Sequence, residues 1–290
     1  MCIRDSPAIA AWDDYACSSC PDTIVGAFLI TGGRVSSYFS PSTTTQEQQA
    51  YNVYLGKIDL TSGVITVSIS LLYAYDSSTI DSSMPARFGS VAWVIGNSFM
   101  IQGGFHLGSH TLDEYATDCT ADATGRVWAF DAGLTDAGVL ASTAPWSLVA
   151  EAPEATTTAC TTSEVDAAGI EGGLGRGRHA ATLVGTTSVR ISGGLRHASS
   201  TPAFVSSLYD QWELDLATYT WTQYTATSWS SESVPSDRNR WDHAMVTLGE
   251  SRVVVAGGNC LTDAHCVSEY VFTQPSGTAA FVDELSLIHI

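Results

Sequence analysis

Short apolar runs with a period of two recur along most of this chain. Val, Ile, Thr, Tyr, Trp and Phe dominate these runs, which is typical of half-buried β-strands. Four runs end in a pair of glycines, and a β-branched residue stands two positions before the first glycine each time. The copies are Ile30-Thr31-Gly32-Gly33, Ile101-Gln102-Gly103-Gly104, Ile191-Ser192-Gly193-Gly194 and Val255-Ala256-Gly257-Gly258. The pattern predicts one β-unit repeated four times.

The sequence around the glycine pairs extends the repeat. Arg176 and Arg240 each open an Arg-x-x-His-Ala segment, and the same number of residues separates its histidine, His179 or His243, from the next glycine pair. A looser copy opens at Arg87, and the first unit has no clear copy. Downstream of the third pair, Asp215–Trp221 reads Asp-Leu-x-Thr-x-x-Trp. These recurring residues are therefore expected to serve the structure of the repeat.

Each unit holds four such runs, with turn residues such as Thr61-Ser62-Gly63 between the last two. Glycine pairs allow positive φ and close backbone approach. A four-stranded antiparallel meander cannot bury both faces alone, whereas meanders stacked face to face can. The pattern therefore predicts an all-β fold, a β-propeller built of four-stranded antiparallel blades.

This combined motif resembles the kelch repeat, and the third unit, from Arg176 to Trp221, matches nearly throughout. The resemblance implies blades of about 50 residues and more blades than the four visible here, so we expect an incomplete ring. The expected propeller segment is 7–284. Its blades are expected at roughly 7–75, 76–155, 171–228 and 234–284.

The two ends fit none of these units. Residues 1–6 and 285–290 resemble translated sequencing-adapter sequence, which contaminates assembled environmental reads. We therefore expect both ends to lie outside the fold and the chain to be an internal fragment of a longer propeller.

Composition narrows the range of partners. The 290 residues include 30 acidic and 12 basic ones, for a net charge of −18. Phosphate binding needs a basic stripe, so we expect no nucleic-acid partner and no attraction to anionic membranes. The sequence has no apolar run of the roughly 18 residues that a membrane span needs.

Six cysteines, with Cys2 set aside, lie in predicted loops. An even number favours disulfides and a secreted or extracellular setting; six reduced thiols are the alternative. The candidate pairs are Cys17–Cys20, Cys119–Cys160 and Cys260–Cys266.

Other candidate chemistry is weak. The two groups with metal-binding residue types are Cys260, Asp263, His265 and Cys266, and His106, His110, Asp113 and Glu114. The first group lacks a second Cys-x-x-Cys half and the second has no fixed helix face, so neither predicts a metal site. The glycine-rich segment 171–177 lacks a phosphate-loop ending, and no Gly-x-Ser-x-Gly elbow occurs. No catalytic residue and no cofactor is predicted.

The arginines near the repeat turns suggest a binding role. In protein-binding kelch propellers, the residues after the glycine pair and those opening the next strand often face one rim. The resemblance therefore implies a ligand site at Arg34, Arg87, Arg176, Arg196, Asn239 and Arg240. Bidentate hydrogen bonds from arginine suit a carboxylate-rich peptide or an anionic sugar; packing between blades is the alternative role of these arginines.

Three functions follow from the sequence. The first is a scaffold that binds a protein, peptide or sugar at the propeller rim. The second is a carbohydrate-active enzyme like galactose oxidase or a sugar epimerase, although no residue-level match supports the copper site of galactose oxidase. The third is a structural module of a large surface protein.

Overall fold

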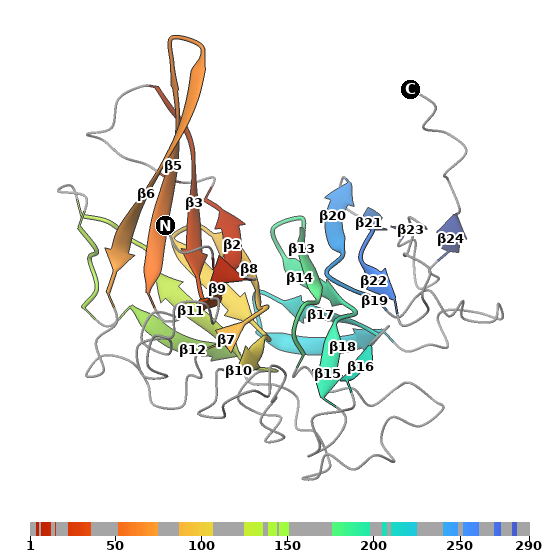
Figure 1. Ribbon diagram of the computed structural model, residues 1–290. Coiled ribbons are helices and arrows are strands. Elements are labelled where there is room, and N and C mark those ends of the chain that lie inside the picture. Colours follow the sequence, from red (N-terminus) through yellow and green to blue (C-terminus); the bar gives the residue numbers. More distant parts are fainter. Residues whose placement is uncertain are drawn as a thin grey trace. The chain divides into compact units, whose positions relative to one another are not determined.

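The structure is a computed structural model in which every regular element of the described residues is a β-strand (Figure 1). It describes residues 4–5, 7–12, 15, 23–35, 52–74, 87–106, 125–135, 139–143, 145–150, 176–197, 205–207, 210–224, 240–248, 252–260, 270–273 and 280–282. The structure divides into two compact units, which are Met1–Ala116 with Ala123–Glu151, and Thr117–Asp122 with Ala152–Ile290. The extent of the propeller segment and of its blades stays a prediction.

The first unit contains two four-stranded antiparallel sheets. The first sheet has the order β2-β3-β5-β6 and the second β8-β9-β11-β12, so strands that follow one another within a sheet are neighbours. The first sheet comprises β2 (Ala8–Ala11), β3 (Ile24–Thr31), β5 (Val53–Thr61) and β6 (Val64–Tyr73). The second comprises β8 (Val91–Ile95), β9 (Ser98–Gln102), β11 (Val127–Asp131) and β12 (Trp146–Ala150).

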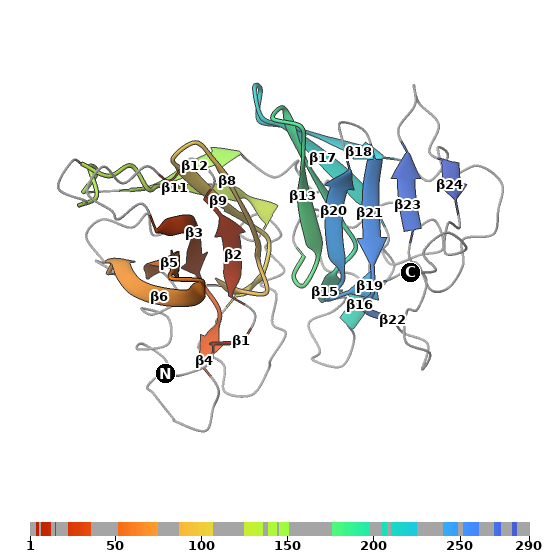
Figure 2. The ribbon, with the colours of Figure 1, turned by 90° about the horizontal axis from the view of Figure 1, so that it is seen from above.

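The second unit repeats this arrangement (Figure 2). Its sheets have the orders β13-β14-β17-β18 and β20-β21-β23-β24. The third sheet comprises β13 (Ala180–Val184), β14 (Ser188–Ser192), β17 (Gln211–Asp215) and β18 (Thr220–Tyr224). The fourth comprises β20 (Ala244–Leu248), β21 (Arg252–Ala256), β23 (Tyr270–Thr273) and β24 (Ala280–Val282). In all four sheets the glycine pair directly follows the second strand, as the sequence predicts.

A short two-stranded ribbon accompanies the glycine pair in three of the repeats. One strand of the ribbon precedes the first strand of the sheet, and the other follows the glycines at the end of the second strand. The ribbon therefore pairs two segments that are separated in sequence by the first two strands of the sheet. The pairs are β1 (Arg4–Asp5) with β4 (Arg34–Val35), β7 (Arg87–Phe88) with β10 (Phe105–His106), and β19 (Arg240–Trp241) with β22 (Asn259–Cys260). In the third repeat Gly177 forms a single bridge to Leu195 in β15 (Leu195–His197), which also pairs with β16 (Val205–Ser207).

The ribbons show a copy of the repeat start that the sequence pattern did not indicate. Arg4 lies opposite Val35 in the same register in which Arg87 lies opposite His106 and Arg240 lies opposite Cys260. Arg4 therefore holds the arginine position of the first unit, with proline in place of the histidine. Arg4 and Asp5, two of the twelve terminal residues expected to lie outside the fold, pair with β4 here; the adapter origin of the two ends stays a prediction.

Each unit has its own core. Large aromatic side chains dominate the first, where Trp12, Phe99, Trp128, Phe130 and Trp146 pack with aliphatic residues of the first sheet. In the second unit, valines of the third and fourth sheets pack together with Met245.

The last hairpin of the first sheet departs from the repeat. β5 has 9 residues and β6 has 10, whereas the strands of the second sheet have five each. Figure 1 shows this hairpin extending well beyond β3. Every residue from Thr61 to Leu71 is exposed, so the hairpin displays side chains that other repeats do not have.

Candidate functional site

The glycine pairs adopt the backbone conformation that the sequence predicts. All eight glycines have positive φ. The second glycine of a pair is also held tightly: a Cβ on Gly194 would lie 2.7 Å from the His179 Cβ, and one on Gly258 would lie 2.8 Å from the His243 Cβ. Both the conformation and the space thus require glycine. The turn and the Arg-x-x-His segment form one packed unit.

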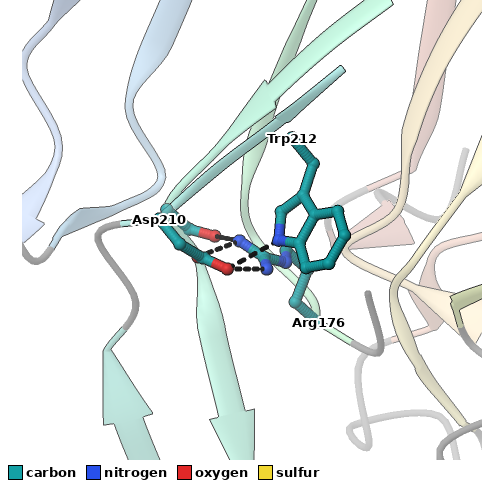
Figure 3. Close-up of polar contacts among 4 residues, drawn as sticks. Arg176, Asp210 and Trp212 are labelled. Carbon is teal, nitrogen blue, oxygen red and sulfur yellow. Dashed lines mark hydrogen bonds and ion pairs between the residues drawn. The ribbon is translucent and has the colours of Figure 1, made fainter. Parts of the chain in front are cut away.

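Arg176 forms the most highly connected polar group of this turn (Figure 3). Its two terminal nitrogens donate to the two carboxylate oxygens of Asp210 at 2.6 and 2.7 Å, and one also donates to the Gly193 carbonyl at 3.0 Å. The Trp212 Nε1–H donates to Asp210 Oδ2 at 2.7 Å. The Arg176 side chain is 0% exposed. A buried charge needs such a partner and such hydrogen bonds.

Arg240 repeats part of this arrangement in the fourth unit. It is 2% exposed, and one of its terminal nitrogens donates to the Gly257 carbonyl at 3.0 Å, the distance of the Arg176–Gly193 contact. Two of the six predicted ligand-binding residues, Arg176 and Arg240, are therefore interior groups that hold the repeat turn. Both arginines therefore have the packing role and not the role at the rim, and the contacts described here lie within their own repeat.

Backbone hydrogen bonds join the turns of the third and fourth repeats. The Gly194 N–H donates to the Arg240 carbonyl at 2.8 Å, and the Asp242 N–H donates to the Arg178 carbonyl at 2.9 Å. Arg178 and Asp242 also form an ion pair at 3.4 Å on the surface. Both have positive φ, of 56° and 55°. The second variable position of Arg-x-x-His is thus a left-handed residue that turns the chain into the sheet.

The two repeat histidines are buried and neutral. Burial lowers the pKa of His179 well below its usual value, and the charge of Arg176 and then the electrostatic interaction with His243 lower it further. Burial, followed by the Arg240 charge, lowers the pKa of His243 to about 3. Each histidine packs its Cβ beside the second glycine of its repeat. Both observations support the packing role that their recurrence predicts.

Asp215 and Trp221 belong to the β17–β18 hairpin. The Asp215 carboxylate accepts hydrogen bonds from the Thr218 N–H at 2.8 Å, the Thr218 hydroxyl at 3.0 Å and the Ala217 N–H at 2.9 Å. The two Thr218 bonds and then the Ala217 bond lower the Asp215 pKa. Trp221 lies opposite the fully buried Leu214. The aspartate thus fixes the turn and the tryptophan shares the buried face of Leu214.

The remaining predicted ligand residues lie on or beside the ribbons. Arg34 is in β4 opposite Asp5, Arg87 is in β7 opposite His106, and Arg196 is in β15 opposite Ser206. Arg34 and Arg196 lie one and two positions after a glycine pair, whereas Arg87 holds the recurring arginine position that Arg240 holds in the fourth repeat. Asn239 lies outside the described residues and precedes β19.

Several other predictions fall outside the described residues. Of the cysteines in the candidate disulfides, the description includes only Cys260, in β22. Of the two groups with metal-binding residue types, it includes only Cys260 and His106. In the part of the chain that the structure describes, no helix has the length and apolarity to cross a membrane.

Sequence reasoning missed the acidic partners of the buried arginines. Asp210 lies 34 residues from Arg176, and Glu213, which pairs with Arg190 at 2.6 Å, lies 23 residues from it. Asp210 directly precedes a strand that carries Trp212 and Leu214, and Arg190 is a charged residue between Val189 and Ile191 inside a strand. A charged residue within or beside a strand could have indicated an ion pair, because buried charges require partners.

Comparisons with known proteins agree at the level of fold. No protein-family profile and no curated protein matches the sequence. A solved structure, that of YjhT, superposes with a TM-score of 0.50 and 12% sequence identity over 89% of this chain. The chain has an all-β, propeller-like fold. It spans 66% of the YjhT chain, and the likeness concerns the fold alone.

Proposed function

We propose that this protein is a kelch-type propeller that serves as a binding scaffold for a ligand bearing carboxylate groups. The observation that carries this proposal is that the repeat turns combine recurring structural residues with residues that vary from repeat to repeat. Arg176 and Arg240 occupy the recurring arginine position and are buried. The residues after the glycine pairs differ from repeat to repeat although their backbones occupy the same place. Such variation on a constant scaffold is typical of a binding surface.

Arginine gives that surface its proposed chemistry. The chain carries 30 acidic and only 12 basic residues, yet arginine stands directly after the first glycine pair and two positions after the third. The site is assigned to Arg34 and Arg196, with Asn239, which directly precedes the recurring arginine of the fourth repeat, as a proposed further member. Arg87 holds the recurring arginine position itself, at which Arg176 and Arg240 are buried. Guanidinium groups bind carboxylates through two parallel hydrogen bonds. The acidic remainder of the chain repels anions, so a carboxylate ligand would be held at these positions alone.

Titration with two carboxylate probes tests the proposal. A fluorescent hexaglutamate peptide and a labelled oligogalacturonate represent a peptide and a sugar source of the same chemistry. We expect one probe to bind the full chain, and Arg34→Ala or Arg196→Ala to weaken it about tenfold, because a hydrogen bond to a charged group contributes about 1.5–3 kcal/mol. Arg34→Lys should restore only part of the affinity, because lysine lacks the bidentate geometry.

Arg252→Ala is the matched control. Arg252 begins β21, at the opposite end of that strand from its glycine pair, so its removal changes the net charge equally without touching a ribbon. Equal loss of affinity in Arg252→Ala and Arg34→Ala would show that the loss comes from the change in net charge and not from a specific site. Absence of binding by both probes would refute the carboxylate ligand.

A further inference from the structure

One face of the first sheet is apolar, and most of its described side chains are exposed or half-buried. Residues opposite each other in an antiparallel sheet share a face. One row of this face crosses all four strands through Ile9, Ile30, Tyr54 and Leu71, and the next through Ala11, Phe28, Gly56 and Ile69. Val67, 57% exposed, and Ile9, 53% exposed, lie at its two edges. None of these rows contains a charged residue.

The opposite face of the same sheet is buried against the second sheet. Ala8, Ala10, Leu29 and Leu55 of the first sheet share a core with Phe99 and Ile101 of the second. Ile101 stands two positions before a glycine pair, the position that Ile30 holds in the first repeat. The second sheet therefore turns its Ile101 face toward the preceding sheet.

The second unit follows the same rule. Val255, again two positions before a glycine pair, packs with Val253 and Met245 against Val184 of the third sheet. On this face the Thr182 and Thr247 hydroxyls lie 3.1 Å apart. In both described pairs, the face before the glycines contacts the preceding sheet. The Ile30 face of the first sheet is also a face before a glycine pair. It should therefore pack against a face like the one that Ala8 and Leu29 form toward the second sheet.

The fourth sheet exposes a face of that complementary kind. Val246 and Val254 lie opposite each other, as do Ala244 and Ala256, on the side turned away from Val255. Val246 is 52% exposed and Ala244 is also exposed. Small aliphatic side chains form these two rows, as alanines do on the buried face of the first sheet, and Arg252 follows in the next row of the same face, away from the glycine pair. Both faces thus continue an interface that each unit already contains.

We propose that the Ile30 face of the first sheet binds the Val246 face of the fourth sheet of a second copy of this chain. Each copy has one face of each kind, so the contact is head to tail. Burial of these aliphatic side chains supplies the driving force. At a net charge of −18, copies repel each other elsewhere, and the two uncharged rows are where approach is least opposed. This assembly does not depend on the ligand proposed above.

The mass of the full chain in solution, measured by light scattering after size exclusion, tests the proposal with matched variants. We expect wild type to have the mass of two or more copies and Val67→Lys to be monomeric. Thr66→Lys is the control: it adds the same charge to the same exposed strand, but on the other face and opposite Asp59. It should assemble like wild type. Circular dichroism and thermal unfolding show that each variant is folded.

Mixing two variants tests the head-to-tail geometry. Val246→Lys should also be monomeric, because it blocks the other face. Val67→Lys keeps an intact Val246 face and Val246→Lys keeps an intact Ile30 face, so their mixture should form a one-to-one dimer. A monomeric wild type, equal assembly of Val67→Lys and wild type, disruption by Thr66→Lys, or no dimer on mixing would each overturn the proposal.

Discussion

The two pairs of sheets are built on one backbone repeat but held together by different chemistry. In the first pair, Phe130 is fully buried and contacts the rings of Tyr73 and Trp146 edge-on, with centroids 5.6 and 5.1 Å apart. The second pair has valines between its sheets and buried polar groups at its turns, including the Arg176–Asp210 pair and two neutral histidines.

The difference shows which residues recur in every sheet and which residues vary with the packing around the turn. Glycine pairs with positive φ occur in all four repeats. The residue in the histidine position, by contrast, is Pro7, Ser90, His179 or His243. The turn therefore depends on backbone conformation, and the side chains around it adapt to either an aromatic or a polar interior.

The largest expected effect is the loss of aromatic packing in the first unit. Phe130→Ala should lower the free energy of unfolding by about 4 kcal/mol, because it removes a buried ring and leaves a cavity. Urea unfolding followed by tryptophan fluorescence measures this change. Val139→Ala, at a valine that is 62% exposed, should change it by less than about 0.5 kcal/mol. Similar values for both variants would contradict an aromatic core.

Removing the carboxylate that pairs with Arg176 in the second unit should lower the free energy of unfolding slightly less than Phe130→Ala does. Asp210→Asn keeps the shape of the side chain but leaves the Arg176 charge buried without a counter-charge, which should cost about 3 kcal/mol of unfolding free energy. Glu213→Gln makes the same change on a carboxylate that is 24% exposed, so it should cost about 1 kcal/mol or less. The same unfolding experiment compares them, and an equal cost would mean that burial does not distinguish the two pairs.

Acid should weaken the second unit over a pH range set by its histidines. Their pKa values are lowered in the folded state, so the unfolded chain takes up protons first as the pH falls below about 6.5. Stability should therefore decrease with falling pH toward about 3, the folded pKa of His243. The slope should approach about 1.4 kcal/mol per pH unit for each histidine.

Hydrogen exchange between pH 4.5 and 7 measures this dependence in each unit. Amides of β13 and β20, which follow the two histidines, should lose protection at low pH after correction for the intrinsic exchange rate. His243→Leu should reduce the slope. A second unit whose protection does not change with pH, or an unchanged slope in His243→Leu, would show that these histidines are not the cause.

Sequence reasoning predicted the fold well because the repeat is local. Alternation identifies strands, and the glycine pairs mark the end of the second strand in every sheet. The repeat start of the first unit is hard to recognise in the sequence because it has Pro7 in the histidine position.

The site was less predictable, because what surrounds a side chain depends on residues far along the chain. Nothing in the local sequence around Arg176 indicates that this arginine is buried, because its partner Asp210 lies 34 residues away. The apolar alternation of β6 likewise predicts a strand with one buried face, whereas Ile69 is 43% exposed. Sequence specifies which face is apolar, and only the packing shows whether another sheet covers it.

The central claim is that the second sheet and the fourth sheet each pack the face before their glycine pair onto the preceding sheet of the same unit. Disulfide trapping tests it most directly, with Thr182→Cys/Thr247→Cys across the contact and Thr182→Cys/Val246→Cys as the control, because Val246 is next to Thr247 but on the other face. Peptide mass spectrometry after mild oxidation should find the 182–247 crosslink within single chains and no 182–246 crosslink. Equal crosslinking of both pairs, or none of the first, would contradict this packing.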